Sequence, residues 1–435
     1  MLKMDSVFRR LSTDNVLGDL FRRVIQTLGT RVCLLLISIV SGIFVARVLG
    51  PAGRGEYAVA SVVAATASQF VNLGLHSSNT HYLAKDRQLL PVLLGNSLLV
   101  GLGLAGTLGL CITLFSFIWP EHAPVQGLMV VLILFAVPLY TLFTLLQNLL
   151  LGLYETVLFN KVELYMGLGS LMLVLLFYLS DLASPASFYS SGLVVTCFVL
   201  FWMGWRLKKY GKEGIQVSIA LLREHLSYSI KVYLSCLFAF LLVRADLLMI
   251  RYFLGQEETG LYAITVSLGD MLYMLPLATA TILFPRLSAE ACSVKRWQIA
   301  KKVALLIALF MAIAGMLAFP LIKPLVELFY GKAYLPAASA FQYLVPGIMF
   351  LSVNVIFMNY FGAEGNPPVV MLSPGLALLF NIMLNFFLIP QFGINGAALA
   401  SSICYGFMLI VSLSYLRWWG NPTRKLKVFK SRVFS

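Results

Sequence analysis

The stretch ARVLGPAGRGEYAVA, residues 46–60, joins two long apolar segments, and its outline returns at residues 250–264 as IRYFLGQEETGLYAI. Both copies fit the pattern Leu-Gly-x4-Gly-x-Tyr-Ala, which begins at Leu49 and again at Leu254. Spaced glycines allow a tight reversal of the chain, and tyrosine is typical of the membrane–water interface. The repeat therefore predicts two equivalent turns, one in each half of the chain. A helix hairpin that recurs by chance is the alternative.

The composition predicts an integral membrane protein. Of 435 residues, 60% are apolar and 11% charged, whereas soluble domains contain roughly 45–50% and about 25%. A bilayer core of about 30 Å requires around 20 apolar residues per helix. We predict an all-α fold of twelve transmembrane helices, at residues 24–49, 56–83, 89–118, 126–151, 158–180, 187–206, 226–253, 258–284, 300–322, 336–361, 369–389 and 395–418.

The net charge of +14 reflects orientation in a membrane and does not require nucleic acid as a partner. With the amino terminus placed in the cytoplasm, cytoplasmic segments receive 24 of the 32 lysines and arginines, and outer segments receive five. This asymmetry follows the positive-inside rule. It predicts that both termini are cytoplasmic.

The spacing of the repeat predicts two parallel six-helix halves around a central cavity. Six spans separate the two turns, an even number, so both lie on the outer side and the halves are related by an axis along the membrane normal. The predicted divisions are a basic leader (1–23), a first half (24–206), a cytoplasmic linker (207–224), a second half (225–418) and a basic tail (419–435).

Enzyme chemistry is not indicated. The six cysteines and four histidines show no disulfide, zinc or other metal-binding spacing, and we find no nucleotide-binding glycine loop. The predicted outer loops are too short for a catalytic domain. The sequence therefore predicts no catalytic residues, no metal site and no cofactor.

Polar residues inside the first-half spans are candidates for a cavity lining. Arg31 lies on the first span, which contains no acidic residue. Ser68 and Asn72 belong to a stripe whose members step by three and four along the second span. Because ionisable groups at bilayer depth are costly, we predict that Arg31 binds substrate, together with Ser68 and Asn72. Helix packing is the open alternative for the two small residues.

The second half adds two arginines and two carboxylates. Arg244 and Arg251 are predicted to bind substrate; Asp246 and Asp270 are the candidates for ion coupling. Arg244 cannot easily pair with Asp246, because residues two apart on a helix do not face each other. An ion pair with Asp270 is the alternative for Arg244. Arg251, like Arg54 of the first turn, could instead extend to the outer head groups.

Three stretches resemble the polysaccharide-transporter (Wzx-type) flippases, whose superfamily also contains multidrug extruders and lipid II flippases. They are FVARVLGPAGRGEYAVA (44–60), RADLLMIRYFLGQEETGLYA (244–263) and NIMLNFFLIPQFGINGAALASSICYG (381–406). The resemblance extends over all twelve spans, although the predicted spans five and six match sparsely. The lipid II branch usually has fourteen spans, which counts against it here.

The resemblance implies export of a polyprenyl-diphosphate-linked oligosaccharide across the bacterial cytoplasmic (inner) membrane by alternating access. It also implies contact with membrane lipid, and with a polysaccharide polymerase and chain-length machinery as partners. Arginines in the cavity suit this cargo, because a guanidinium pairs with phosphate through a planar fork. The alternatives are an ion-coupled multidrug antiporter and, less favoured, a membrane glycan polymerase or ligase.

Overall fold

The computed structural model describes residues 13–210 and 214–420, and all regular structure in these ranges is helical. The predicted leader up to residue 12 and the tail from residue 421 lie outside the described residues. The α-helices are α2 (Thr13–Asn72), α3 (Leu75–Lys85), α4 (Leu90–Leu98), α5 (Ala105–Ile118), α6 (Leu128–Gly152), α7 (Thr156–Leu179), α8 (Pro185–Lys208), α9 (Ile219–Leu254), α10 (Gln256–Ala289), α11 (Ser293–Phe329), α12 (Leu335–Ala363) and α13 (Val369–Tyr415). Short helical turns are η1 (Arg87–Leu89), η2 (Leu99–Leu104), η3 (Lys332–Tyr334) and η4 (Leu416–Gly420).

Twelve membrane crossings follow from these helices, as predicted. Ten helical stretches of the described chain are long and apolar enough to cross a bilayer. Two of them, α2 and α13, are broken by a glycine with positive φ, Gly50 at 65° and Gly393 at 61°. Each of these two helices therefore supplies two crossings. Several helices extend beyond the predicted spans, and the second predicted span (56–83) is divided: α2 ends at Asn72, and the left-handed residues Leu73 and Gly74 start α3 in a new direction.

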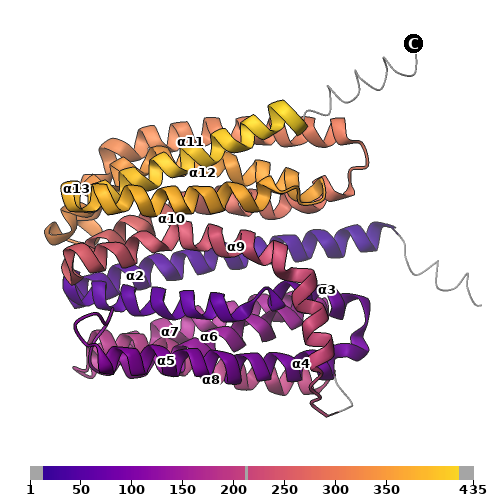
Figure 1. Cartoon of the computed structure of the whole chain (residues 1–435), viewed down its shortest axis with the longest axis horizontal. Helices are drawn as coiled ribbons and strands as arrows, with labels where there is room; N and C mark the ends of the chain where they lie inside the picture. The colour runs from indigo at the N-terminus through magenta and orange to yellow at the C-terminus, as the bar shows by residue number, and fades with distance from the viewer. Residues whose placement is uncertain (1–12, 211–213, 421–435) are drawn as a thin grey trace, which may run out of the picture.

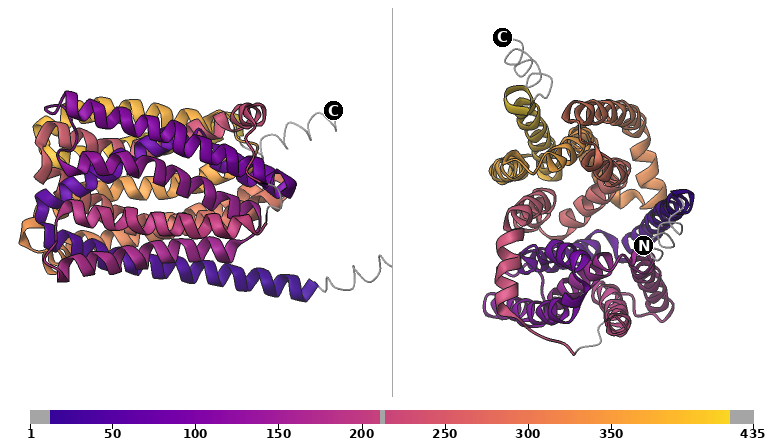
Figure 2. Two further views of the ribbon diagram at one scale, coloured as in Figure 1. Left: turned by 90° about the horizontal axis from the view of Figure 1, so that it is seen from below. Right: turned by 90° about the vertical axis from the view of Figure 1, so that its right-hand side faces the viewer.

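The helices form two bundles side by side. In Figure 1, α10–α13 occupy the upper part of the molecule and α2–α8 the lower part, with α9 between them; the end-on view in Figure 2 separates the two groups. Each bundle has its own apolar core, one built mainly from residues 58–207 and the other from residues 242–416. The described chain starts and ends at the same end of the molecule (Figure 1). The boundaries predicted for the two halves stay predictions.

The repeated turns have matching backbones. Gly50 (φ 65°, ψ 178°) and Gly255 (φ 91°, ψ −168°) occupy a region that is essentially restricted to glycine. Each turn reverses the chain without an intervening loop and joins two successive crossings. This shared backbone geometry is the physical reason why the same motif occurs twice in the sequence.

The second glycine of each motif lies where the two halves meet. A Cβ atom on Gly55 would fall 1.9 Å from the backbone oxygen of Gln256, and one on Gly260 would fall 1.8 Å from that of Pro51. Neither helix could approach the other this closely with any side chain at these positions. The two copies of the motif therefore pack against each other, around the axis that relates the halves.

The segment before α9 is attached to the first half by polar contacts. The side-chain amide of Asn96 donates to the carbonyl of Ser218 (3.1 Å) and its oxygen accepts from the Ser218 amide (3.0 Å). The Gln216 amide donates to the carbonyl of Pro91. A Cβ on Gly95 would lie 1.9 Å from the Gln216 oxygen. The described part of the predicted linker is thus seated on α4.

Candidate functional site

A polar cavity with two lobes lies between the halves, under the repeated turns. The larger lobe has a volume of ≈ 550 Å³ and is lined by α2, α10 and Arg244 of α9, with Tyr330. The smaller lobe, ≈ 320 Å³, extends between α2, α9 and α10. The lobes share four lining residues, Arg54, Tyr57, Arg244 and Ser267. Both halves therefore contribute a guanidinium to the same space.

Arg54 is one of the two arginines for which an extended position at the outer head groups was considered, and the structure places it in the cavity lining. It directly precedes Gly55, so the close packing of the two turns carries it inward. Its guanidinium lies 5.3 Å from the ring centre of Tyr57. Its Nε is buried, and no described residue accepts a hydrogen bond from it. Arg54 is therefore a cation in the cavity with an unsatisfied donor.

Arg244 faces both lobes and forms the ion pair that was one of its two predicted roles. Its Nη2 lies 2.9 Å from Oδ2 of Asp270 on the next helix. Both side chains stay partly exposed, Arg244 at 30% and Asp270 at 47%. The pair thus lies on the cavity wall, and both partners are accessible from the cavity.

Arg31 has an acidic partner, which comes from another helix. Its Nη1 lies 2.7 Å from Oε2 of Glu163 on α7, and Gln147 on α6 donates to the other carboxylate oxygen at 3.2 Å. Arg31 lies one turn before Leu35, a residue of the larger lobe, on the same face of α2. It is therefore next to the cavity, on the side toward the chain ends.

Three further residues predicted for the cavity pack elsewhere. Ser68 is buried and accepts a hydrogen bond from the hydroxyl of Thr141 (3.0 Å). The side-chain oxygen of Asn72 accepts from the His76 amide (3.2 Å), across the break between α2 and α3. Arg251 donates to the carbonyl of Pro124 (3.0 Å). None of the three lines either lobe, so their role in substrate binding stays a prediction; for the two small residues, packing was the open alternative.

Asp246 is the centre of a buried polar network in the second half. Its carboxylate, 2% exposed, accepts hydrogen bonds from the hydroxyls of Tyr262 and Ser401 and from the Leu247 amide. Ser401 also accepts from Asn381 (3.4 Å), whose side-chain oxygen accepts from Asn385 (2.9 Å). The network joins α9, α10 and both crossings of α13. Sequence patterns did not predict it, because 155 residues separate Asp246 from Ser401.

Comparison with known proteins identifies the family of the chain. A family model described as "Polysaccharide biosynthesis protein" matches residues 22–290. That range contains the first bundle, both repeated turns and every cation of the cavity. The chain belongs to the polysaccharide biosynthesis protein family. The resemblance inferred from the three quoted stretches is confirmed.

Two archaeal relatives match in sequence. An uncharacterized membrane protein of Methanocaldococcus jannaschii is 27% identical over 261 residues, 57% of this chain and 50% of that protein. The probable low-salt glycan biosynthesis flippase Agl15 of Haloferax volcanii is 24% identical over 244 residues, 54% of this chain and 50% of that protein. The chain thus spans about half the length of the curated relatives it matches.

Solved structures share the fold of this family member along nearly its whole length. The lipid II flippase MurJ in an inward closed conformation has a TM-score of 0.69 at 14% identity, over 91% of this chain and 87% of that one. An inward-facing multidrug resistance MATE family transporter of the MOP superfamily has a TM-score of 0.73 at 13% identity, over 92% and 99%. The multi-pass architecture is therefore that of membrane transporters.

Proposed function

We propose that this chain is a flippase that moves a polyprenyl-diphosphate-linked oligosaccharide from the inner to the outer leaflet of the bacterial cytoplasmic membrane. The single observation that carries the proposal is Arg54, a cation with a free donor in a cavity between two helix bundles. Family membership and the transporter fold support it. The O-antigen, capsule or exopolysaccharide repeat unit is the expected class of cargo.

The chemistry of the cavity suits a diphosphate. Arg54 and Arg244 both face it, and only Arg244 has a carboxylate partner among the described residues. A guanidinium donates two parallel hydrogen bonds to a phosphate group. A phosphate bound at Arg54 would satisfy the buried Nε donor, and Arg244 would add charge from the other half. A cationic cavity disfavours cationic drugs as the cargo.

Alternating access is supported by the arrangement of the repeated turns. The two turns pack against each other through Gly55 and Gly260, next to the cavity residues Arg54 and Tyr57. Transport requires this contact to separate while the bundles close at the opposite end. Arg31 and Glu163, on that opposite side of the larger lobe, would then meet the cargo as it enters. Arg31 is thus a proposed contact at the entrance and Arg54 the main anchor.

The test is surface polysaccharide in a strain that lacks the native gene, measured with the membrane abundance of each variant. Arg54→Ala is expected to abolish surface glycan at normal abundance. Arg54→Lys should restore part of the export, because lysine keeps the charge and loses the planar fork. Arg47→Lys is the matched control, because Arg47 contacts backbone carbonyls of Leu328 and Phe329 outside the cavity. Full export by Arg54→Ala would refute the assignment.

Asp246 is the proposed coupling site. The carboxylate can take up a proton, or it can bind a hard cation together with neighbouring oxygen atoms. Asn385 supports the second option, because its side-chain oxygen is buried and accepts no hydrogen bond from the described residues. Ion binding here would change the position of α13 relative to α9 and α10, because the network connects the three helices. Asp270 is the less buried candidate, and its contact with Arg244 ties it to the cavity.

An ion-coupled multidrug antiporter is the second candidate, and the buried Asp246 favours it. The two functions differ in what binds at the arginines. An antiporter would give the host strain resistance to cationic drugs, and Arg54→Ala would leave that resistance intact. A glycan flippase would give surface polysaccharide and no drug resistance. Expression in a strain that lacks both activities separates the two.

The proposed orientation has both termini in the cytoplasm, with the repeated turns outside. A reporter that is active only in the periplasm should give signal when fused at Glu121, Ser184 or Asn395. The same reporter at Asp86 or Lys295 should stay silent. The reverse pattern would overturn the orientation. A polymerase and chain-length machinery on the outer side are the proposed partners.

A further inference from the structure

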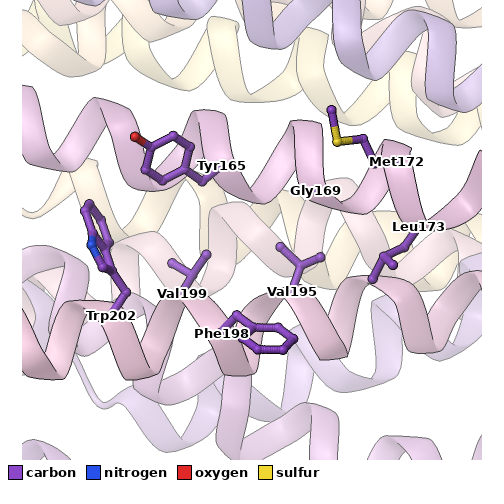
Figure 3. Close-up of a pocket in the computed structure, with 8 residues that line it drawn as sticks. All are labelled: Tyr165, Gly169, Met172, Leu173, Val195, Phe198, Val199 and Trp202. Carbon is purple, nitrogen blue, oxygen red and sulfur yellow. The ribbon is translucent and has the colours of Figure 1, made fainter.

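An apolar groove runs along the bilayer-facing surface of α7 and α8, outside the central cavity. Its volume is ≈ 460 Å³, and its lining consists of Tyr165, Gly169, Met172, Leu173, Val195, Phe198, Val199 and Trp202. Figure 3 shows Tyr165 and Trp202 at one end of the groove and Met172 with Leu173 toward the other. Phe198 and Met172 are 71% and 67% exposed, so the groove opens toward lipid.

Basic side chains gather at the Trp202 end. The Arg206 guanidinium lies 5.5 Å from the ring centres of both Trp202 and Trp205, and Lys209 Nζ lies 4.5 Å from that of Trp205. Such cation–π contacts hold the two charges beside the indoles. Among the described residues, neither Arg206 nor Lys209 forms a salt bridge, and the Arg206 Nε is buried without an acceptor.

The groove has the dimensions and polarity of a lipid chain that ends in an anionic head group. From Tyr165 to Met172 the helix rises about 10 Å, so the groove holds the part of a chain nearest its head. Basic pockets between transmembrane helices on the cytoplasmic side bind anionic lipid head groups. Under the orientation proposed above, Arg206 and Lys209 lie on that side.

The flippase cargo does not fit this position. Gly167 of α7 faces Leu34 and Ile37 of α2, the helix that lines the cavity. Tyr165 and Gly169 are each two residues from Gly167 and so lie on the opposite side of α7. A head group at Arg206 is therefore separated from Arg54 and Arg244 by the body of the helix.

We infer that the α7–α8 groove is a binding site for an anionic phospholipid of the inner leaflet, with one acyl chain along the groove and the head group at Arg206 and Lys209. The site is separate from the proposed transport cavity. The lipid would lie on a helix pair that packs closely at Gly169, where a Cβ would lie 2.9 Å from Val195 Cγ1.

The test is native mass spectrometry of the full chain, purified in detergent and titrated with dioleoyl phosphatidylglycerol or dioleoyl phosphatidylcholine. The wild-type chain should retain the anionic lipid in preference. The double variant Arg206→Gln/Lys209→Gln should lose that preference, by about fivefold for each basic residue removed. Lys301→Gln/Lys302→Gln, an exposed basic pair on α11, is the matched control and should retain it.

A second variant tests the groove itself. Met172→Trp places a large side chain over the groove from an exposed position and should reduce retention of both lipids, whereas Phe310→Ala, on the exposed face of α11, should not. Equal retention of the two lipids by the wild-type chain would overturn the inference, and so would a control pair that behaves like Arg206→Gln/Lys209→Gln. A polyprenyl diphosphate that displaces phosphatidylglycerol from this site would make the cargo its occupant and overturn the assignment. These outcomes do not depend on Arg54, so they are distinguishable from a failure of the flippase proposal.

Discussion

The two halves share a fold and differ in what they bury. In the first half, polar side chains within the core are neutral and paired with one another, as Ser68 is with Thr141 and Asn79 with Ser97. In the second half, the corresponding layer surrounds the carboxylate of Asp246. A neutral hydrogen-bonded pair has one stable state, whereas a buried carboxylate changes charge when it gains or loses an ion. The comparison is the reason for proposing the ion-binding site in the second half.

The cavity arginines of the two halves also differ, in whether they have an acidic partner. The second-half arginine, Arg244, is matched by Asp270, whereas the first-half arginine, Arg54, has no acidic partner among the described residues. On the proposed function, the first half therefore contributes the cation that is free to bind an anion. Under the proposed function, the first half would hold the cargo and the second half would bind the ion, with the contact between α2 and α10 joining them.

The largest effect that would sharpen this comparison is expected for Asp246→Asn. The amide keeps the size of the side chain and removes its ability to bind a proton or a cation, so gradient-driven export should be lost while the protein inserts normally. Transport into proteoliposomes with and without an imposed ion gradient is the measurement. Asn79→Asp, which adds a carboxylate to the first half, should not restore the dependence on the gradient. Gradient-dependent export by Asp246→Asn would break the comparison.

The second-largest effect is expected for a substitution at the contact between the halves. Gly260→Ala forces a Cβ against the backbone of Pro51, and no side-chain rotation relieves that clash. Overpacking of this kind costs about 1–3 kcal/mol, so the population should shift about fivefold or more toward the state with the turns apart. Labelling of a cysteine placed at Ala52 by a membrane-impermeant reagent measures the shift. Glu257→Ala, on the same turn, is the control, and equal labelling in the two variants would show that the glycine contact does not set the conformation.

A smaller effect is expected at the entrance. Arg31 is 42% exposed, and partly exposed ion pairs contribute about 0–1 kcal/mol. Glu163→Gln should therefore leave the protein folded and alter export by only about fivefold or less. Arg31→Ala should reduce export more, since it removes the cation itself. If the two variants have the same effect, the pair is structural and Arg31 makes no contact with cargo.

The smallest effect is expected for Ser68→Ala in the first-half core. Hydrogen bonds between membrane helices contribute about 0.6 kcal/mol on average, and Thr141 keeps a second acceptor in the carbonyl of Val137. Thermal unfolding in detergent should change by no more than a few degrees, and export should stay normal. A large loss of export at normal abundance would return Ser68 to the group of cargo-binding residues.

The sequence predicted the twelve crossings and the turn that repeats, because apolar length and spaced glycines are local properties. It also contained, as the alternative to substrate binding, the ion pair of Arg244 with Asp270, which lie at similar depth on adjacent spans. It missed the place of Arg54, because the inward position of that side chain depends on how closely two distant glycines pack. Ser401, which contacts Asp246, and Glu163, which pairs with Arg31, come from helices far along the chain, and helical periodicity within one span cannot identify them.

The two hydrogen bonds between Asn96 and Ser218 have a consequence for how the chain can be divided. The segment that leads into α9 is held on α4 by side-chain and backbone hydrogen bonds, so this joint does not rely on an unbroken backbone between Tyr210 and Gly214. Two co-expressed pieces, divided between those residues, would still contain both sides of the Asn96–Ser218 contact and of the Gly55–Gly260 contact. The affinity between the two pieces would then measure how strongly the halves associate, and Asn96→Ala should weaken it.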